Sequence, residues 1–438
     1  MAYCSLGCSK NLVDTETMMG LLRSAGMAPA VDRALADVVF INTCAFIADS
    51  AQESVDTILE FARDRREGRI DALVVAGCLA QRYGRSLMEQ IPEIDALIGT
   101  GDCGLCVEAV QAALRGERPV FVGAPGFLAE EGGPRVMATP RHFAYLKIAE
   151  GCANRCSYCL IPSLRGPARS RPAEAIVREA ESLASSGARE LIVIAQDTTA
   201  YGRDLYGRPS LARLLRELAG VEGVEWIRVM YTYPSLIDNE LIDVLAGEER
   251  IVKYLDIPMQ HGSDKVLQMM NRRSSREQMM QLCRCLRERV PGLVIRTSLI
   301  VGFPGETDYD FEELLSFIDI VRPERAGVFE FSAEEGTRAY DMPGQVPGEV
   351  AARRRGAAME ALARISREFG ESRVGRVVRV LVDGPSDESD LVVEARSYSE
   401  APEVDGKIYI GDAELAAGEM VDVRITDAGQ YDLAAERV

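Results

Sequence analysis

The chain has 438 residues, which is too long for one ordinary domain and predicts two or three domains. Its 47% content of apolar residues favours large buried cores over disorder. A formal net charge of −18 argues against generic binding to a phosphate backbone. Eleven cysteines stand beside only two histidines, which argues against histidine-rich zinc or copper sites and against Ser-His or Cys-His catalysis.

The amino terminus, MAYCSLGCSKN, lacks the basic segment and apolar stretch of a secretory signal. The sequence also lacks a run of about 18 apolar residues, so we expect no membrane partner and a cytoplasmic location. Cytoplasmic thiols are normally reduced, and eleven of them in one chain suggest roles as metal ligands or in catalysis. The alternative is that most are small buried apolar residues.

Residues 1–114 alternate short apolar runs with helical patterns, which predicts a βαβ parallel-sheet domain. The apolar runs are AYCSL, VVFIN (38–42) and ALVVAG (72–77). Cys8, Cys44 and Cys78 each follow one of these strands and precede a helix. The carboxyl ends of parallel strands share one edge, so we expect the three thiols to converge there. Three buried structural cysteines are the alternative.

Residues 115–140 are rich in glycine and proline and are interpreted as a linker. Residues 141–372 resume the alternation of strands and helices and end in a long polar helical pattern near Gly370. Residues 373–438 contain short β-branched runs broken by Gly, Asp and Pro, which predicts a small β-barrel. The chain is therefore expected to form three domains of overall α/β class.

The segment EGCANRCSYCLIP carries Cys152, Cys156 and Cys159 in a C-x3-C-x2-C pattern. Chance would produce such a triple only about 0.007 times in this chain, against about 0.3 times for a C-x2-C pair such as Cys103 and Cys106. Three thiolates on one loop suit a [4Fe–4S] cluster with one open iron, which can take the amino and carboxylate groups of a methionine derivative. A structural zinc site is the alternative, but it needs a fourth ligand, which the motif lacks.

This motif after the strand FAYLKIA (143–149) resembles the radical S-adenosylmethionine (radical SAM) signature. The downstream pattern fits the partial (β/α)6 TIM-like barrel of that superfamily. Further strands are expected at 191–196, 226–231, 254–260, 294–302 and 326–332. YLDIPMQHGSDKVLQMMNR and RTSLIVGFPGETDYDF resemble its methylthiotransferases, and so does the order of a three-cysteine domain, a barrel and a TRAM-like β domain. The resemblance extends from end to end.

Two bacterial branches of that family differ in substrate. SLGCSKNLVDTE around Cys8 and AQDTTAYG (195–202) resemble the RimO branch, which modifies an aspartate of the twelfth small-subunit ribosomal protein. The other branch, which modifies an adenosine of transfer RNA, typically has GCQMN-like and GQNVNSY-like stretches instead. A tRNA adenosine 2-methylthiotransferase therefore remains the alternative function. A non-catalytic iron–sulfur scaffold or sensor is a third possibility, from a different class.

The charge of the last domain is an independent indication. Residues 375–438 contain six basic and fifteen acidic residues, a net charge of −9. The acidic residues include Asp383, Asp387, Glu388, Asp390, Glu394, Glu400, Glu403 and Asp405. Such a domain should repel RNA and attract a basic protein, so direct RNA binding is not expected and a basic ribosomal protein is, free or on the ribosome. A role of the acidity in solubility alone is the alternative.

The resemblance implies two [4Fe–4S] clusters and S-adenosyl-L-methionine (SAM) as cofactors, together with an electron donor and a sulfur donor. The cluster on Cys152, Cys156 and Cys159 would bind SAM and allow its reductive cleavage to a 5′-deoxyadenosyl radical. That radical would take hydrogen from the β-carbon of the aspartate. The cluster on Cys8, Cys44 and Cys78 would carry the sulfur, which a second SAM methylates. No catalytic residue beyond these ligands is predicted.

Several other residues are assigned less specific roles. Polar residues near the ends of barrel strands are expected to face SAM or the substrate, namely Gln196, Asp197, Arg296 and Ser298. FPGE (303–306) is interpreted either as part of the adenine pocket or as a tight turn. Arg165, Arg169 and Arg171 either hold an acidic target or lie in a solvated loop, and His261 is expected to be structural. The remaining cysteines are interpreted as non-ligands: Cys4, Cys103, Cys106, Cys283 and Cys285.

Overall fold

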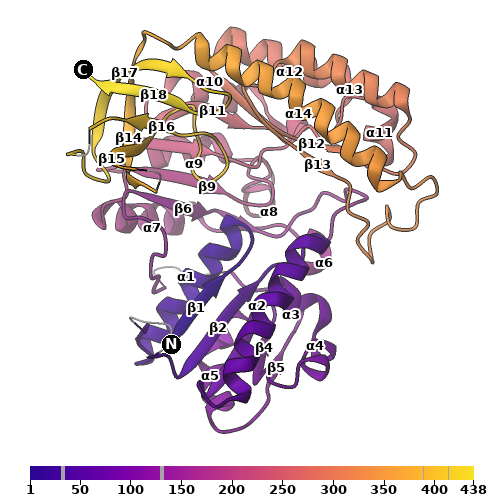
Figure 1. Cartoon of the computed structure of the whole chain (residues 1–438), viewed down its shortest axis with the longest axis vertical. Coiled ribbons are helices and arrows are strands. Elements are labelled where there is room, and N and C mark those ends of the chain that lie inside the picture. Colours follow the sequence, from indigo (N-terminus) through magenta and orange to yellow (C-terminus); the bar gives the residue numbers. More distant parts are fainter. Residues whose placement is uncertain (31–34, 129–132, 388, 413) are drawn as a thin grey trace.

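The computed structural model describes residues 1–30, 35–128, 133–387, 389–412 and 414–438. A five-stranded sheet with its helices forms the amino-terminal part, a six-stranded sheet the centre and a closed five-stranded barrel the carboxy-terminal part (Figure 1). Among the described residues, none of the helices combines the length and apolar character needed to cross a membrane. The predicted fold class is confirmed in all three parts.

The first sheet is parallel throughout, in the order β1-β2-β3-β4-β5. Its strands are β1 (Ala2–Ser5), β2 (Val38–Thr43), β3 (Ala72–Gly77), β4 (Ala96–Ile98) and β5 (Val120–Phe121). The helices of this part are α1 (Ser9–Ser24), α2 (Ala48–Arg66), α3 (Cys78–Tyr83), α4 (Arg85–Gln90) and α5 (Cys106–Leu114). Every residue of β2 and β3 is buried, as continuous apolar runs predict. The two short strands β4 and β5 have too few residues for a clear apolar run and were not predicted.

The stretch expected to be a linker takes part in the fold. Its Val120 and Phe121 form the edge strand β5, which pairs with β4. Further along, Arg135 forms ion pairs with Glu16 of α1 and with Glu179 at 2.6 Å. Residues 129–132 of this stretch lie outside the described residues. The connection between the first two parts of the chain is therefore held to both of them.

The central sheet is parallel and follows the chain order from β6 to β13, as in an open (β/α)6 barrel. Its strands are β6 (Phe143–Lys147), β9 (Glu190–Ile194), β10 (Trp226–Val229), β11 (Ile251–Asp256), β12 (Val294–Val301) and β13 (Arg325–Glu330). The helices are α6 (Ile161–Arg165), α7 (Ala173–Ser185), α8 (Arg203–Tyr206), α9 (Leu211–Ala219), α10 (Asn239–Gly247), α11 (Asp264–Met269), α12 (Arg276–Arg289), α13 (Asp308–Val321) and α14 (Gly348–Glu371). All six predicted strands are found within a few residues of their expected positions.

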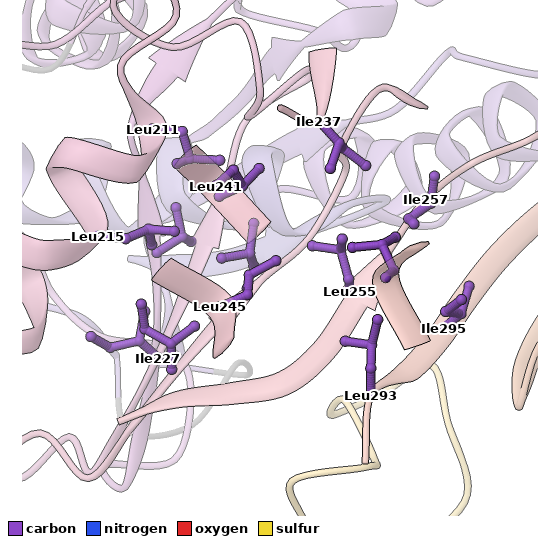
Figure 2. Close-up of a cluster of buried hydrophobic side chains, with 14 of the residues drawn as sticks. Leu211, Leu215, Ile227, Ile237, Leu241, Leu245, Leu255, Ile257, Leu293 and Ile295 are labelled. Carbon is purple, nitrogen blue, oxygen red and sulfur yellow. The ribbon is translucent and has the colours of Figure 1, made fainter. Parts of the chain in front are cut away.

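The main core of the barrel lies between its strands and the surrounding helices. Figure 2 shows leucines of α9 and α10 packed against apolar side chains of β10, β11 and β12. The opposite, inner face of the sheet carries a second cluster that includes Phe143, Tyr145 and Tyr254. Ala401 from the third part and Val13 from α1 belong to this inner cluster. Both flanking domains therefore reach the inside of the open barrel.

The third part is a closed barrel in the order β14-β15-β16-β18-β17 around its own apolar core. Its strands are β14 (Val377–Ser386), β15 (Ser389–Ser397), β16 (Ile408–Ile410), β17 (Met420–Ala428) and β18 (Leu433–Arg437). At its junction with the centre, Glu190 is fully buried between Arg228, at 2.7 Å, and Arg396, at 2.6 Å. A carboxylate between two guanidinium groups compensates for desolvation and holds the two parts together.

His261 gives a first testable prediction, on the stability of the barrel. Its ring is fully buried, its Nδ1 accepts a hydrogen bond from the Ser263 N–H at 2.9 Å, and burial lowers its pKa to about 3. The unfolded chain, with a histidine pKa of about 6.5, binds this proton more tightly, so stability is lost as pH falls below that value. Between pH 6.5 and 4.5 the loss should be about 2.3 kcal/mol, because the unfolded histidine is already half protonated at pH 6.5. Thermal unfolding across this pH range should show a smaller loss for His261→Gln than for the wild type, and equal losses would contradict the prediction.

Candidate functional site

Cys8, Cys44 and Cys78 lie where the sequence predicts them. Cys8 occupies the N-cap position of α1 after β1, Cys44 lies between β2 and α2, and Cys78 begins α3 directly after β3. Because β1, β2 and β3 are parallel neighbours, the three thiols share the carboxyl edge of the first sheet. Cys8 is exposed and the other two are buried.

The contacts around these thiols test whether they suit a cluster. Gly7 has a φ of +86°, and a Cβ there would lie 2.8 Å from Sγ of Cys44, so only glycine lets the Cys8 loop approach so closely. Burial raises the pKa of the Cys78 thiol to about 11, and the nearby Cys44 and Cys8 thiols add to the rise while Arg165 opposes it. The three thiols are therefore close enough to influence one another's charge. This donor set fits a thiolate-bound iron–sulfur cluster.

Cys152, Cys156 and Cys159 lie on the loop between two short antiparallel strands, β7 (Ala149–Glu150) and β8 (Arg169–Ser170). The loop also has internal hydrogen bonds, from the Cys159 N–H to the Cys156 carbonyl at 3.2 Å and from the Ile161 N–H to Sγ of Cys159 at 3.4 Å. Burial raises the pKa of Cys159 to about 12, with further increases from Cys156 and then Cys152. These three thiols also fit a cluster held by one tight loop.

A segment around the end of α11 holds this cysteine loop in place. The backbone N–H and the hydroxyl of Ser157 donate to the carbonyls of Met270 and Met269, at 3.0 and 2.8 Å. Arg272 lies nearby, with a guanidinium nitrogen 3.8 Å from Sγ of Cys156 and its plane over the ring of Tyr233. Nothing in the motif itself indicated Arg272.

Within the described residues, no three His, Cys, Asp or Glu side chains lie close enough together to bind one metal ion. Ligands of a four-iron cube bind different irons, so they lie further apart than ligands of one ion. The finding is compatible with either cysteine set holding a cluster, and the six ligand assignments stay predictions.

A buried network of charged side chains joins the two cysteine sites. Asp14 of α1 forms ion pairs with Lys147 of β6 and with Arg165 at the end of α6. Glu150 of β7 lies 2.7 Å from Lys147 and 3.3 Å from Arg165. Burial opposes ionisation of Glu150, but the charges of Lys147 and Arg165 hold its pKa at about 2. The other guanidinium nitrogen of Arg165 is 3.6 Å from Sγ of Cys78.

Gln196 and Asp197 lie beside the cysteine loop of the barrel. Gln196 donates a hydrogen bond to Glu150, and its buried Oε1 has no partner among the described residues. Asp197 accepts hydrogen bonds from Asn154 of the cysteine loop at 2.7 Å and from Thr199 at 2.6 Å. The unpartnered oxygen of Gln196 is an acceptor available for an N–H group of a ligand. The predicted roles of both residues toward SAM stay predictions.

Arg296 and Ser298 lie on β12. Arg296 forms ion pairs with Asp256 at 3.1 Å and with Asp405 of the third domain at 3.5 Å. These contacts tie Arg296 to the segment that enters the open barrel, an arrangement that the sequence did not indicate. Ser298 is half-buried, and its backbone carbonyl accepts a hydrogen bond from the Gln260 N–H at 2.9 Å. Contact of either residue with SAM also stays a prediction.

The arginines after the cysteine loop already have partners within the protein. Arg165 belongs to the charged network, and Arg171 pairs with Glu179 at 2.6 Å. Arg169 donates to the backbone carbonyls of Pro167 and Arg165, at 2.9 and 3.2 Å. All three arginines are buried or half-buried. The interpretation that they lie in a solvated loop is therefore wrong.

Four of the five cysteines interpreted as non-ligands lie in apolar surroundings away from the two cysteine sets. Cys103 and Cys106 are buried near α5, and their thiols donate to the carbonyls of Thr100, at 3.6 Å, and Met18, at 3.9 Å. Cys283 is buried in the barrel core, and Cys285 packs at its margin. Their environments are those of small apolar residues.

Comparisons with known proteins identify the family. An uncharacterized protein family, UPF0004, matches residues 1–99, the radical SAM superfamily matches residues 146–318, and the TRAM domain matches residues 374–438. A protein of Pelotomaculum thermopropionicum named ribosomal protein uS12 methylthiotransferase RimO is 51% identical over 435 residues, which cover 99% of this chain and 98% of that protein. The chain belongs to the RimO family. RimO of Desulforudis audaxviator is 50% identical, and the match covers 99% of this chain and 96% of that protein. RimO of Geobacter sulfurreducens is 47% identical, and the match covers 100% of this chain and 98% of that protein.

Solved structures agree on the fold of this RimO chain. The radical SAM methyltransferase TsrM from Kitasatospora setae has a TM-score of 0.56 and 17% identity, and the match covers 75% of this chain and 72% of TsrM. The cobalamin-dependent SAM radical enzyme OxsB has a TM-score of 0.51 and 13% identity, and the match covers 83% of this chain and 56% of OxsB. The RimO family predicted from SLGCSKN and AQDTTAYG is confirmed, and the chain is a radical SAM methylthiotransferase that uses an iron–sulfur cluster and SAM.

Proposed function

We propose that this enzyme adds a methylthio group to the β-carbon of an aspartate in ribosomal protein uS12. The observation that carries the proposal is the near-complete similarity to proteins named for uS12 methylthiolation. The geometry supports it because two three-cysteine sites, one in each of the first two domains, are joined by the network of Asp14, Lys147, Glu150 and Arg165. A sulfur site beside a radical site is what this reaction needs.

We assign one [4Fe–4S] cluster to each cysteine set, so that the protein holds two. When bound, the barrel cluster and SAM supply the radical that activates an unreactive C–H bond, and the other cluster carries the sulfur. The chain's own residues hold and orient these groups. Gln196 presents an acceptor beside the barrel loop that has no partner among the described residues, while Asp197 accepts a hydrogen bond from Asn154 of that loop. An electron donor and a sulfur donor complete the reaction, which we place in the cytoplasm.

The structure refines the argument from the acidic third domain. Asp383 pairs with Arg396 at 2.8 Å, Glu400 pairs with Arg325 at 2.7 Å, and Asp405 contacts Arg296. These carboxylates are therefore not free to attract a partner. Among the side chains that the structure describes, the exposed carboxylates of the domain are Asp387, Glu403, Glu414, Glu419, Asp422, Asp427, Asp432 and Glu436. Glu388 and the side chain of Asp390 lie outside the described part of the chain. The exposed set still favours a basic protein over RNA.

A deletion strain tests the substrate directly. Mass spectrometry of its ribosomal proteins should show uS12 without the methylthio group, and the gene supplied in trans should restore it. Nucleosides from tRNA of the same strain should keep their 2-methylthio adenosines. Loss of these nucleosides with uS12 still modified would favour the tRNA alternative. Failure of the reconstituted protein to form 5′-deoxyadenosine from SAM and a reductant would favour a scaffold.

A further inference from the structure

Lys10 is a buried lysine without a counter-ion among the residues that the structure describes. It lies two residues after Cys8 in the first turn of α1, and its side chain is only 6% exposed. Its ammonium lies 2.7 Å from the centre of the Tyr231 ring. In the part of the chain that the structure describes, that ammonium has neither a carboxylate within ion-pair distance nor a hydrogen-bond acceptor. Burying such a charge is costly, and an aromatic ring offsets only part of the cost.

Two carboxylates near Lys10 and Tyr231 pair with other cations. Asp14, one turn along α1, pairs with Lys147 and Arg165. Asp256, which accepts the backbone N–H of Tyr231 at 3.0 Å, pairs with Arg296. The surrounding residues therefore leave the charge of Lys10 uncompensated, and an anionic ligand would complete the site.

The protein holds the Tyr231 ring against Lys10 at some conformational cost. Tyr231 follows β10 and has a φ of +61°, a backbone conformation that residues other than glycine seldom adopt. Its carbonyl accepts the Thr198 N–H at 3.0 Å, and its hydroxyl lies 3.5 Å from that of Ser9. The helix α1 packs against β6 of the barrel at this junction (Figure 1). Lys10 is thus placed where the first domain meets the carboxyl ends of the barrel strands.

We infer that Lys10 binds the side-chain carboxylate of the substrate aspartate and so selects aspartate over asparagine. This inference rests on the proposed function and deepens it. A ring covers one side of an ammonium group and leaves N–H donors on the other side, which a carboxylate accepts in a charge-assisted hydrogen bond. The β-carbon that is modified is bonded directly to that carboxylate. A cation near Cys8 that holds the carboxylate would therefore place the β-carbon between the sulfur site and the barrel.

Binding of uS12 to the anaerobically reconstituted enzyme tests this inference. The ligands are uS12 and its variant with asparagine in place of the target aspartate. We expect the wild type to bind the aspartate form about 10- to 100-fold more tightly. Lys10→Met and Lys10→Gln should bind both forms equally, at the affinity of the asparagine form, and Lys10→Arg should restore part of the preference. Iron content and thermal stability show whether each variant is folded, and the two neutral variants provide alternatives if one is unstable.

Tyr231→Leu is the matched control, because it removes the aromatic contact and keeps the cation. We expect it to retain the preference for aspartate. If Lys10→Met keeps the preference, or if both uS12 forms lose affinity equally, Lys10 only packs the domains together and the inference is overturned. Failure of the proposed function looks different, because the wild-type enzyme itself would then neither bind nor modify uS12.

Discussion

Replacing Cys8, Cys44 and Cys78 together with alanine should halve the iron content and abolish methylthiolation of uS12, while SAM is still cleaved. Two four-iron clusters correspond to about eight irons per chain, so about four should remain. SAM cleavage should persist because its cluster is assigned to Cys152, Cys156 and Cys159, on a separate loop of the barrel. Iron analysis, 5′-deoxyadenosine formation and the mass of uS12 measure the three outcomes.

Two matched variants complete that experiment. Replacing Cys152, Cys156 and Cys159 with alanine should also leave about four irons but should stop 5′-deoxyadenosine formation. Cys285→Ala, in helix α12 and outside both sites, should leave iron content unchanged. Unchanged iron after the first triple substitution would refute the assignment of those three cysteines.

The second large effect is expected from Arg165→Met, which removes a charge from the network between the domains. Arg165 is 3% exposed and pairs with Asp14 and Glu150. Breaking a buried ion pair on one side leaves carboxylates uncompensated and typically costs about 3–5 kcal/mol. The loss should fall on the contact between the first domain and the barrel. Chemical denaturation should show lower stability, and limited proteolysis should show faster cleavage between residues 115 and 140.

Arg165 also lies beside Cys78, so the same variant should alter the amino-terminal cluster. Its guanidinium is 3.6 Å from Sγ of Cys78 and favours a negatively charged thiolate there. Iron should therefore be lost preferentially from this cluster, without loss of SAM cleavage. Arg169→Met is the control, because within the described part of the chain Arg169, in the same loop, donates only to backbone carbonyls. Equal stability and equal iron content in the two variants would contradict the role of Arg165.

Much of the fold could be predicted because its signals are local. Continuous apolar runs predicted β2, β3 and the barrel strands, since strands buried on both faces need no polar alternation. The segment LAQRYGRSLMEQI (79–91) has the pattern of one helix, but Gly84 with a φ of +51° divides it into α3 and α4. A glycine inside a helical pattern does not show by itself whether the chain turns there.

The charged residues of the site could not be predicted in the same way. Asp14, Lys147 and Glu150 are ordinary polar residues in the sequence, and nothing in their spacing indicates that they meet. Asp405 reaches Arg296 only because the third domain sends its 401–405 segment onto the inner face of the barrel. Ion pairs between residues more than a hundred positions apart depend on how the domains pack.

The sequence by itself determined the three-part architecture, the two cysteine sets, the RimO family and the excess of acidic residues in the last domain. The architecture, the cysteine sets and the acidic excess follow from composition, from periodicity and from spacing within short segments, whereas the family follows from the resemblance of motifs such as SLGCSKNLVDTE and AQDTTAYG. Only the tertiary structure decided which charges are engaged: it paired Asp383 and Glu400 with arginines, joined the cysteine sites through Asp14 and Arg165, and left Lys10 without a counter-ion among the described residues. The physical reason is that the energy of a charge depends on its solvent exposure and on its neighbours within a few ångströms, and both are set by contacts between distant parts of the chain.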